Sequence, residues 1–268
     1  MIAVPMAAAA YLLAGVVVRR RGGWWPPGRT ASWCAGLTAI GLALRGPLAT
    51  AAHHDFTAHM ATHLLLGMAA PVLLVLAAPV TLTLRALPVR HARTVSRVLR
   101  SRPVRFASHP VTAAVLDAGG LWLLYRSALF PAMLERPWLH ALIQLHVVVA
   151  GYLFTAAMVG VDPAPHRPGR PLRAATLVVF LAAHGILAKV LYGHPPPGVP
   201  AGPARTGAEL MYYGGDLLDL VLIAVFCAQW YAATDPRRRA AAPRIPGRAP
   251  DRPWRLPAEL RRTGHDER

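Results

Sequence analysis

The sequence predicts an all-α integral membrane bundle of seven transmembrane helices, with the N-terminus outside and the C-terminus cytoplasmic. Three observations predict it: 54% of the 268 residues are hydrophobic, the formal net charge is nevertheless +17, and the arginines cluster between long uncharged stretches. A soluble protein this apolar would distribute its charges over its whole surface. The pattern therefore excludes an ordinary cytosolic enzyme and indicates a membrane protein.

Seven stretches meet or approach the length of about 20 apolar residues that a helix needs to cross a bilayer core. They run approximately over residues 2–18, 31–51, 58–84, 107–130, 138–161, 172–192 and 210–233. The first is short and rich in alanine, and its basic residues, Arg19 to Arg21, follow the apolar run. A cleaved signal peptide has the reverse order, so we expect a retained helix.

The distribution of basic residues predicts the orientation of these helices. With the N-terminus outside, the segments 19–30, 85–106 and 162–171 and the C-terminal tail are cytoplasmic. Four basic residues fall in or beside the first, seven in the second, three at 167–173 and ten in the tail. The five that remain are Arg45, Arg126, Arg136, Lys189 and Arg205. The positive-inside rule is therefore satisfied by every loop.

We expect two parts: a seven-helix transmembrane domain over residues 1–234 and a flexible basic cytoplasmic tail over residues 235–268. The tail has too few apolar residues to build a core. Its arginines could be taken for a nucleic-acid footprint, but basic segments beside membrane helices are expected from topology and from anionic lipid. The expected partner of these charges is therefore the lipid bilayer, with no nucleic acid.

Eight of the twelve histidines fall in the predicted outer half, and three of them lie well inside apolar spans. His63, His146 and His184, together with Asp216 and Asp219, lie about 8 to 14 Å below the outer surface, on four different helices. Because each ionisable group in hydrocarbon costs about 2.5 to 3.5 kcal/mol, a polar layer at one depth indicates a site.

Spacing predicts which of these side chains face one another. His59 and His63 are four residues apart and share a helix face, which Gly67 continues, so that a neighbouring helix can approach closely. His140 and His146 are six apart and point in different directions. We expect His146 to be the buried member of that pair.

Imidazoles and carboxylates from several helices suit a transition metal such as copper, zinc, iron or nickel. Three methionines near the outer surface could add thioether sulfur for Cu(I): Met60, Met133 and Met211. Asp216 and Asp219 are alternatively proton carriers, or Asp216 pairs with Lys189.

Several motifs resemble the signature of the CtaG family, which is associated with assembly of caa3-type cytochrome c oxidase. His59-Met-Ala-Thr-His63 matches the family's H-M-x-x-H run, and it leads into Leu65-Leu-Gly-Met-Ala-Ala-Pro71. The segment from Ala78 to Pro88 reads A-P-V-T-L-T-L-R-A-L-P. The fifth span adds the elements G-Y-L-F, from Gly151, and G-V-D-P, from Gly160. The seventh departs from the family pattern, with Asp216 after its glycine pair where many members have tryptophan.

The resemblance implies a seven-helix protein of the plasma membrane that helps to mature the copper-containing part of a haem-copper oxidase. The resulting hypothesis is an assembly factor that binds copper transiently at an outer-side histidine cluster and presents it to an oxidase subunit. In this hypothesis His59 and His63 are metal ligands, His146 and His184 are further ligands or organisers, and Asp216 orients one imidazole. No catalytic residues are assigned, and an enzyme is not expected.

Two alternatives remain open from the sequence. The first is a haem b electron-transfer protein in which two of His63, His146 and His184 are axial ligands from facing helices. The second is a proton-coupled metal transporter that uses Asp216, Asp219 and Lys189. The transporter requires a polar path to the cytoplasm, and the inner halves of the spans supply little beyond Asp117.

Overall fold

A computed structural model describes residues 3–235, and every regular element in that range is helical. Contacts divide the chain into one unit over residues 1–229 and a second over residues 230–268. The fold described below is that of the first unit. Of the second, the described part is the end of the last helix and Asp235, so the predicted tail lies almost entirely outside the described residues.

The all-helical class is confirmed for the described residues. The elements are α1 (Ala3–Arg20), α2 (Pro27–Leu44), α3 (Pro47–Ala51), α4 (Phe56–Leu64), the π-helical turn η1 (Leu65–Ala69), α5 (Ala70–Leu76), α6 (Pro79–Ala86), α7 (Val89–Leu99), α8 (Arg102–Ala107), α9 (Pro110–Ala114), the π-helical turn η2 (Val115–Gly119), α10 (Gly120–Arg126), α11 (Leu129–Glu135), α12 (Pro137–Val159), α13 (Arg170–Gly193) and α14 (Ala201–Thr234).

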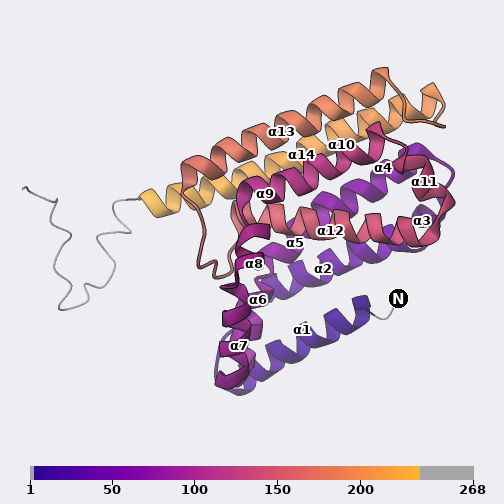
Figure 1. The fold of residues 1–268 in the computed structure, drawn as a ribbon. Coiled ribbons are helices and arrows are strands. Elements are labelled where there is room, and N and C mark those ends of the chain that lie inside the picture. The colour runs from indigo at the N-terminus through magenta and orange to yellow at the C-terminus, as the bar shows by residue number, and fades with distance from the viewer. Residues whose placement is uncertain (1–2, 236–268) are drawn as a thin grey trace, which may run out of the picture. The chain divides into compact units, whose positions relative to one another are not determined.

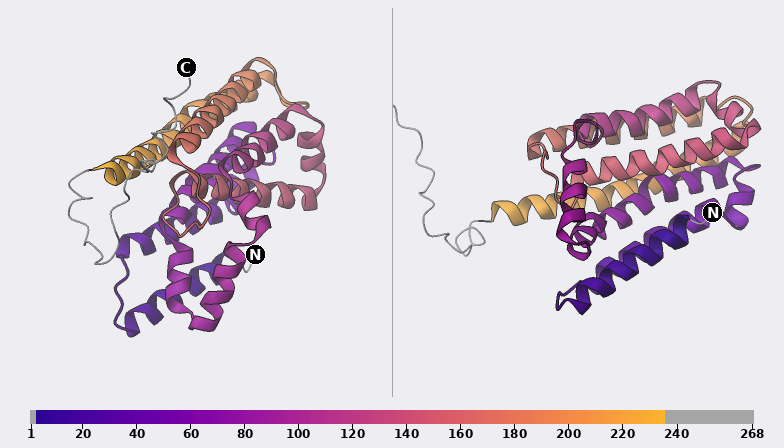
Figure 2. Two further views of the ribbon diagram at one scale, coloured as in Figure 1. Left: turned by 60° about the vertical axis from the view of Figure 1, so that its left-hand side comes forward. Right: turned by 60° about the horizontal axis from the view of Figure 1, so that its bottom comes forward.

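The long helices run alongside one another, and they include two composite rods, α4–η1–α5 and α9–η2–α10 (Figures 1 and 2). The short helices α6, α7 and α8 lie across one end of these rods (Figure 1). Among residues 3–235, five helices are long and apolar enough to cross a membrane: Ala3–Arg20, Phe56–Leu76, Pro137–Val159, Arg170–Gly193 and Ala201–Thr234. Helix α2 and the rod α9–η2–α10 do not meet that measure, so the count of seven spans and their orientation stay predictions.

The predicted third span, 58–84, is wrong beyond Leu76. The helix stops there because Pro79 cannot donate a backbone hydrogen bond and disfavours helical geometry at the residue before it. Ala78 accordingly adopts a left-handed conformation with φ of 51°. A similar break ends the second span at Leu44 instead of residue 51, where Gly46, with φ of 82°, precedes Pro47.

The break after Ala78 is stabilised by a carboxylate from the loop that follows α12. Asp162 accepts hydrogen bonds from the backbone N–H groups of Val80 at 3.1 Å and Thr81 at 2.7 Å, and from the Thr81 hydroxyl at 2.6 Å. These N–H groups open α6 and have no partner within the helix. The A-P-V-T and G-V-D-P motifs of the sequence are therefore one structural junction.

Close contact between α12 and the α4–η1–α5 rod depends on two glycines. A Cβ atom placed on Gly151 of α12 would collide with the carbonyl oxygen of Gly67 in η1 and would lie 3.1 Å from Cγ of Pro71. The predicted close approach at Gly67 is thus confirmed. This contact sets how α12 aligns with the α4–η1–α5 rod, and therefore where the side chains at the ends of these two elements meet.

Candidate metal-binding site

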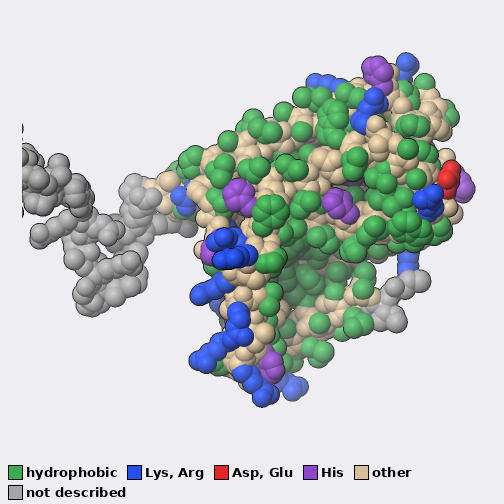
Figure 3. Space-filling model, in the orientation of Figure 1, with side chains coloured by type: hydrophobic (Ala, Val, Ile, Leu, Met, Phe, Trp, Pro, Cys, Tyr) green, Lys and Arg blue, Asp and Glu red, His purple; other side chains and the backbone are tan. Residues whose placement is uncertain are grey.

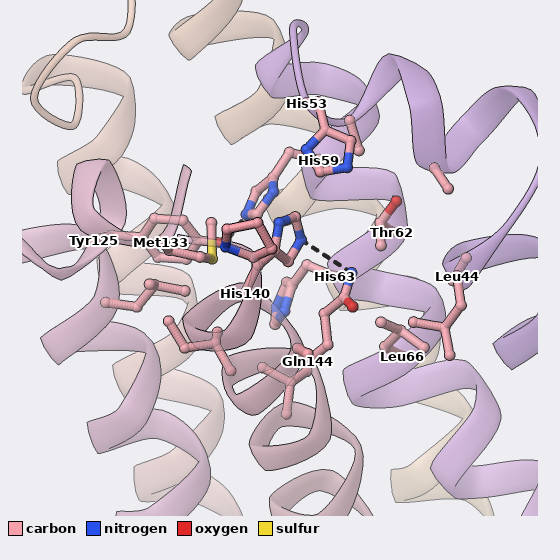
Figure 4. A pocket seen from close by; sticks show the side chains of 18 residues that line it. Leu44, His53, His59, Thr62, His63, Leu66, Tyr125, Met133, His140 and Gln144 are labelled. Atoms are coloured by element: carbon pink, nitrogen blue, oxygen red, sulfur yellow. Dashed lines mark hydrogen bonds between the residues drawn. The ribbon is translucent and has the colours of Figure 1, made fainter. Parts of the chain in front are cut away.

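Four imidazoles line one cavity of about 270 Å³ at the end of the first unit that is opposite α6–α8. His59 and His63 extend from α4, His140 from α12, and His53 from the turn that precedes α4. Met133 of α11, Tyr125 of α10 and Gln144 of α12 complete the polar and sulfur-containing part of the lining. Figure 4 shows these side chains converging on the cavity from separate helices.

The start of α4 is fixed one turn before its first cavity histidine. Asp55 is the N-cap residue, and its carboxylate accepts hydrogen bonds from the backbone N–H groups of Thr57 at 3.0 Å and Ala58 at 3.1 Å. A carboxylate is favourable there because it satisfies N–H groups that have no partner within the helix. With the helix fixed in this way, the four-residue spacing of His59 and His63 directs both rings to the cavity, as that spacing predicts.

Two of the histidines are oriented by neighbouring polar groups. Nε2 of His59 lies 3.1 Å from the hydroxyl of Tyr125. The side-chain amide nitrogen of Gln144 donates to Nε2 of His140 at 3.0 Å (Figure 4). The ring of His140 also meets the ring of His53 edge to face, with centroids 4.9 Å apart. Such contacts fix the tautomer and the direction of an imidazole before any ligand arrives.

His63 differs because its Nε2 atom is buried and has no hydrogen-bond partner. The side chain is 5% exposed. His184 of α13 is buried beside it, with ring centroids 6.2 Å apart, and its Nε2 atom is also unpaired. A buried polar atom without a partner costs about 1 to 3 kcal/mol and calls for an explanation such as an ion. His184 does not line the cavity, so it lies behind His63.

The cavity lining offers imidazole nitrogens and one thioether, together with the Thr62 and Tyr125 hydroxyls and the Gln144 amide, and no carboxylate, lysine or arginine is among its lining residues. Imidazole and thioether donors fit copper, and the thioether fits its Cu(I) form in particular. Within residues 3–235, however, no group of three or more His, Cys, Asp or Glu side chains stands close enough together to hold a metal ion. A metal in this cavity would therefore require side chains to turn toward it.

The prediction that His146 is the buried histidine of α12 is wrong. His146 is exposed, its Nε2 lies 3.0 Å from the carbonyl oxygen of Leu116, and it packs against Gly120. His140 is only 9% exposed and lines the cavity. The predicted depth of a residue below the outer surface does not decide its burial here. Helix α11 and the turn before α4 cover the end of α12 that carries His140, and so this shallower residue is the buried one.

The remaining predicted residues are dispersed. Asp216 is exposed on α14, and Asp219, one turn further, is buried. The alternative pairing of Asp216 with Lys189 is not made in the described part of the chain, where the Lys189 ammonium lies 5.2 Å from the ring centre of Tyr212. The structure therefore brings together His59, His63 and His184 from the predicted set. It adds His140, which was expected to be the less buried member of its pair, and His53, one of the eight histidines of the predicted outer half.

Comparisons with known proteins support one family. A family model described as cytochrome c oxidase caa3 assembly factor (Caa3_CtaG) matches residues 9–233. Uncharacterized proteins of Mycobacterium bovis and Mycobacterium tuberculosis are each 37% identical over 166 residues, which cover 59% of this chain and 25% of the relative. One of Mycobacterium leprae is 34% identical over 176 residues, covering 63% and 25%. The chain thus spans about a quarter of the length of these curated relatives. No solved structure matches.

Proposed function

Because the chain belongs to the caa3 cytochrome c oxidase assembly factor (CtaG) family, we propose that it is a multi-pass plasma-membrane protein that binds copper at the histidine cavity and assists its delivery to an oxidase subunit. Copper is the cargo in this proposal, and no chemical step is assigned to the protein. The cavity faces the outer side if the arginine-rich helices α6–α8 mark the cytoplasmic end. Arginine side chains gather over those helices (Figure 3), as the positive-inside rule requires of that end.

The unpaired Nε2 atom of His63 is the observation that carries the proposal. The atom is buried, and the side chain that carries it lines the cavity together with three other imidazoles and Met133. A soft cation would give this nitrogen a partner and would remove the cost of leaving it unsatisfied. Water could also pair with it, but a thioether beside four imidazoles favours a metal that accepts both kinds of donor.

The arrangement suits transient binding more than permanent storage. We assign His59 and His63 as the principal ligands because α4 holds both on one face, and His140 as a further ligand that turns away from Gln144 when metal arrives. His53 lies in a turn, is exposed, and stands next to His140, so it can receive copper first or release it last. A site with exchangeable ligands on one side can pass its ion to another protein.

Copper retention by matched histidine variants tests this assignment. The His59→Ala/His63→Ala double variant should lose the copper that the purified wild-type protein retains in detergent, as measured by metal analysis. The control is His146→Ala, which removes an exposed imidazole on another face and should leave the copper content unchanged. Equal copper in the double variant and the wild type would refute the site.

One observation favours a second candidate function, the haem-binding alternative. His63 and His184 come from different helices, and their ring centroids are 6.2 Å apart with both Nε2 atoms unpaired. Two such imidazoles are the kind of axial ligands that a haem in a helical bundle uses. A visible absorption spectrum of the same purified sample separates the two functions, because a Soret band is expected only if haem is bound.

A further inference from the structure

A second polar site lies inside the first unit, away from the histidine cavity. Asp117 of η2 and Asp219 of α14 are each only 5% exposed, and both line a small enclosed space of about 10 Å³. The other lining residues are apolar except for Thr155 of α12, and no lysine, arginine or histidine is among them. Two carboxyl groups therefore share one space without a cationic partner in its walls.

The local backbone is built to bring these two groups together. Asp117 lies in η2 and Gly67, which also lines the space, lies in η1, so two of its walls are π-helical turns, while α-helical segments, including α14 with Asp219, form the others. A π-helical turn inserts a residue into a helix and is frequent at functional sites. Oδ1 of Asp219, which lines this space, is buried and has no hydrogen-bond partner, and this is an independent sign that the carboxyl group binds a ligand.

The space and its donors fit a proton better than a metal ion. A volume of about 10 Å³ holds at most about one water-sized particle. Calcium takes at least about six oxygen ligands and magnesium requires an octahedral shell, whereas the side chains here supply two carboxyl groups and one hydroxyl. Two carboxylates that face one small apolar space repel each other, and a single shared proton would remove the repulsion and let one carboxyl donate to the other.

We propose that Asp117 and Asp219 form a proton-binding site in the interior of the bundle, in which one protonated carboxyl group donates a hydrogen bond to the other. This site is separate from the histidine cavity and does not depend on the function proposed for that cavity. The unpaired oxygen of Asp219 is the acceptor or the donor in that bond.

The titratable groups around the pair are few. On α14 itself Asp216 is exposed, and on α12 His146 turns toward the carbonyl oxygen of Leu116. On α13 His184 packs against Gly215, one turn before Asp219, since a Cβ atom on Gly215 would lie 2.7 Å from the imidazole. On α4 His63 lies next to His184. On the neighbouring helices, two buried imidazoles, His184 and His63, are therefore the titratable groups to consider beside the pair.

Buried side-chain atoms without a hydrogen-bond partner occur near both the histidine cavity and the carboxyl pair. Five buried side-chain atoms in the described residues have no hydrogen-bond partner. One, Nε of Arg173, belongs to the other end of α13, and the remaining four belong to Thr62, His63, His184 and Asp219. Thr62 and His63 line the histidine cavity, and His63 lies beside His184, so three of these four atoms belong to side chains in or next to that cavity and the fourth belongs to the carboxyl pair.

Infrared spectroscopy of the full-length protein in detergent tests the proposal without copper. A protonated carboxyl group has a carbonyl stretch that an ionised one lacks and that shifts in heavy water. At neutral pH we expect this band in the wild type and its loss in the Asp117→Asn/Asp219→Asn double variant. Each single variant should retain one acid with a displaced band. The control Asp216→Asn, which changes an exposed carboxyl on the same helix, should leave the band unchanged.

Two results would overturn the proposal. The first is a carboxylic-acid band that is equally strong in the wild type and the double variant, because the protonated group then lies elsewhere. The second is a wild-type band that appears only after sodium or magnesium ions are removed, because the pair then binds a metal cation. If the double variant elutes as aggregate, the single variants decide, since a pair that shares a proton must respond to either substitution.

Discussion

Replacing Asp162 with alanine should weaken the junction between α6 and the loop after α12. The carboxylate accepts three hydrogen bonds, two from backbone N–H groups at the start of α6 and one from the Thr81 hydroxyl. Leaving a buried N–H group without a partner costs about 1 to 3 kcal/mol, and these groups are partly buried, so the lower part of that range applies. We expect the free energy of unfolding to fall by about 2 to 3 kcal/mol in Asp162→Ala.

Asp162→Asn is the matched control because it retains one side-chain acceptor for Thr81 but loses the charge. It should cost about 1 kcal/mol. Denaturant titration of the detergent-purified protein, followed by tryptophan fluorescence, measures both. Burial lowers the pKa of Arg167 and the Asp162 charge opposes that change, so the alanine variant also leaves this guanidinium less favourably placed. An alanine variant as stable as the wild type, or no more damaged than the asparagine variant, would refute this account of the junction.

Three further predictions concern the rods and the cavity. Gly151→Ala should destabilise the protein by about 1 to 3 kcal/mol because its new methyl group meets the backbone of Gly67, whereas Gly15→Ala, which meets nothing within 4 Å, should not lower the unfolding midpoint. Tyr125→Phe removes the hydroxyl beside His59 and should weaken copper binding about 10-fold or more in a competition assay with a chelator; unchanged affinity would show that this hydroxyl does not orient the ligand. Copper affinity should fall as the pH is lowered into the acid range, where protons compete with the metal for the imidazole nitrogens, since only neutral imidazole binds metal; an affinity that is independent of pH down to acid unfolding would contradict histidine ligation.

The sequence predicts the features that depend on local periodicity. The four-residue spacing of His59 and His63 determines their shared face, and Gly67 on the same stripe predicts a close helix contact, because both follow from helix geometry alone. Hydropathy also locates the apolar helices, but it carries the third span past Pro79, since the residues on either side of that proline are equally apolar.

Features made by distant segments could not be predicted in the same way. Whether His140 or His146 is buried depends on which neighbour covers each face of α12, and neither spacing nor depth contains that information. The pairing of Asp117 with Asp219 joins residues on α14 and η2 that only the folded chain brings to one space. A signal was present, since a lone aspartate in the apolar stretch around Asp117 is costly, but it did not identify the partner.

The two junctions on α12 should have separable effects on the histidine cavity. His140 of α12 and His63 of the α4–η1–α5 rod lie at the same end of these two elements. Beyond their other ends, Asp162 joins the loop after α12 to the start of α6. Gly151 lies between these two ends, about 16 Å along α12 from His140. Its contact with Gly67 fixes the alignment of α12 with the α4–η1–α5 rod. Loss of the Asp162 junction should therefore reduce stability but leave copper affinity unchanged in the folded fraction. A larger residue at Gly151 should reduce both, because it displaces His63 relative to His140. If Asp162→Ala lowers copper affinity as much as Gly151→Ala does, the glycine contact does not determine the alignment.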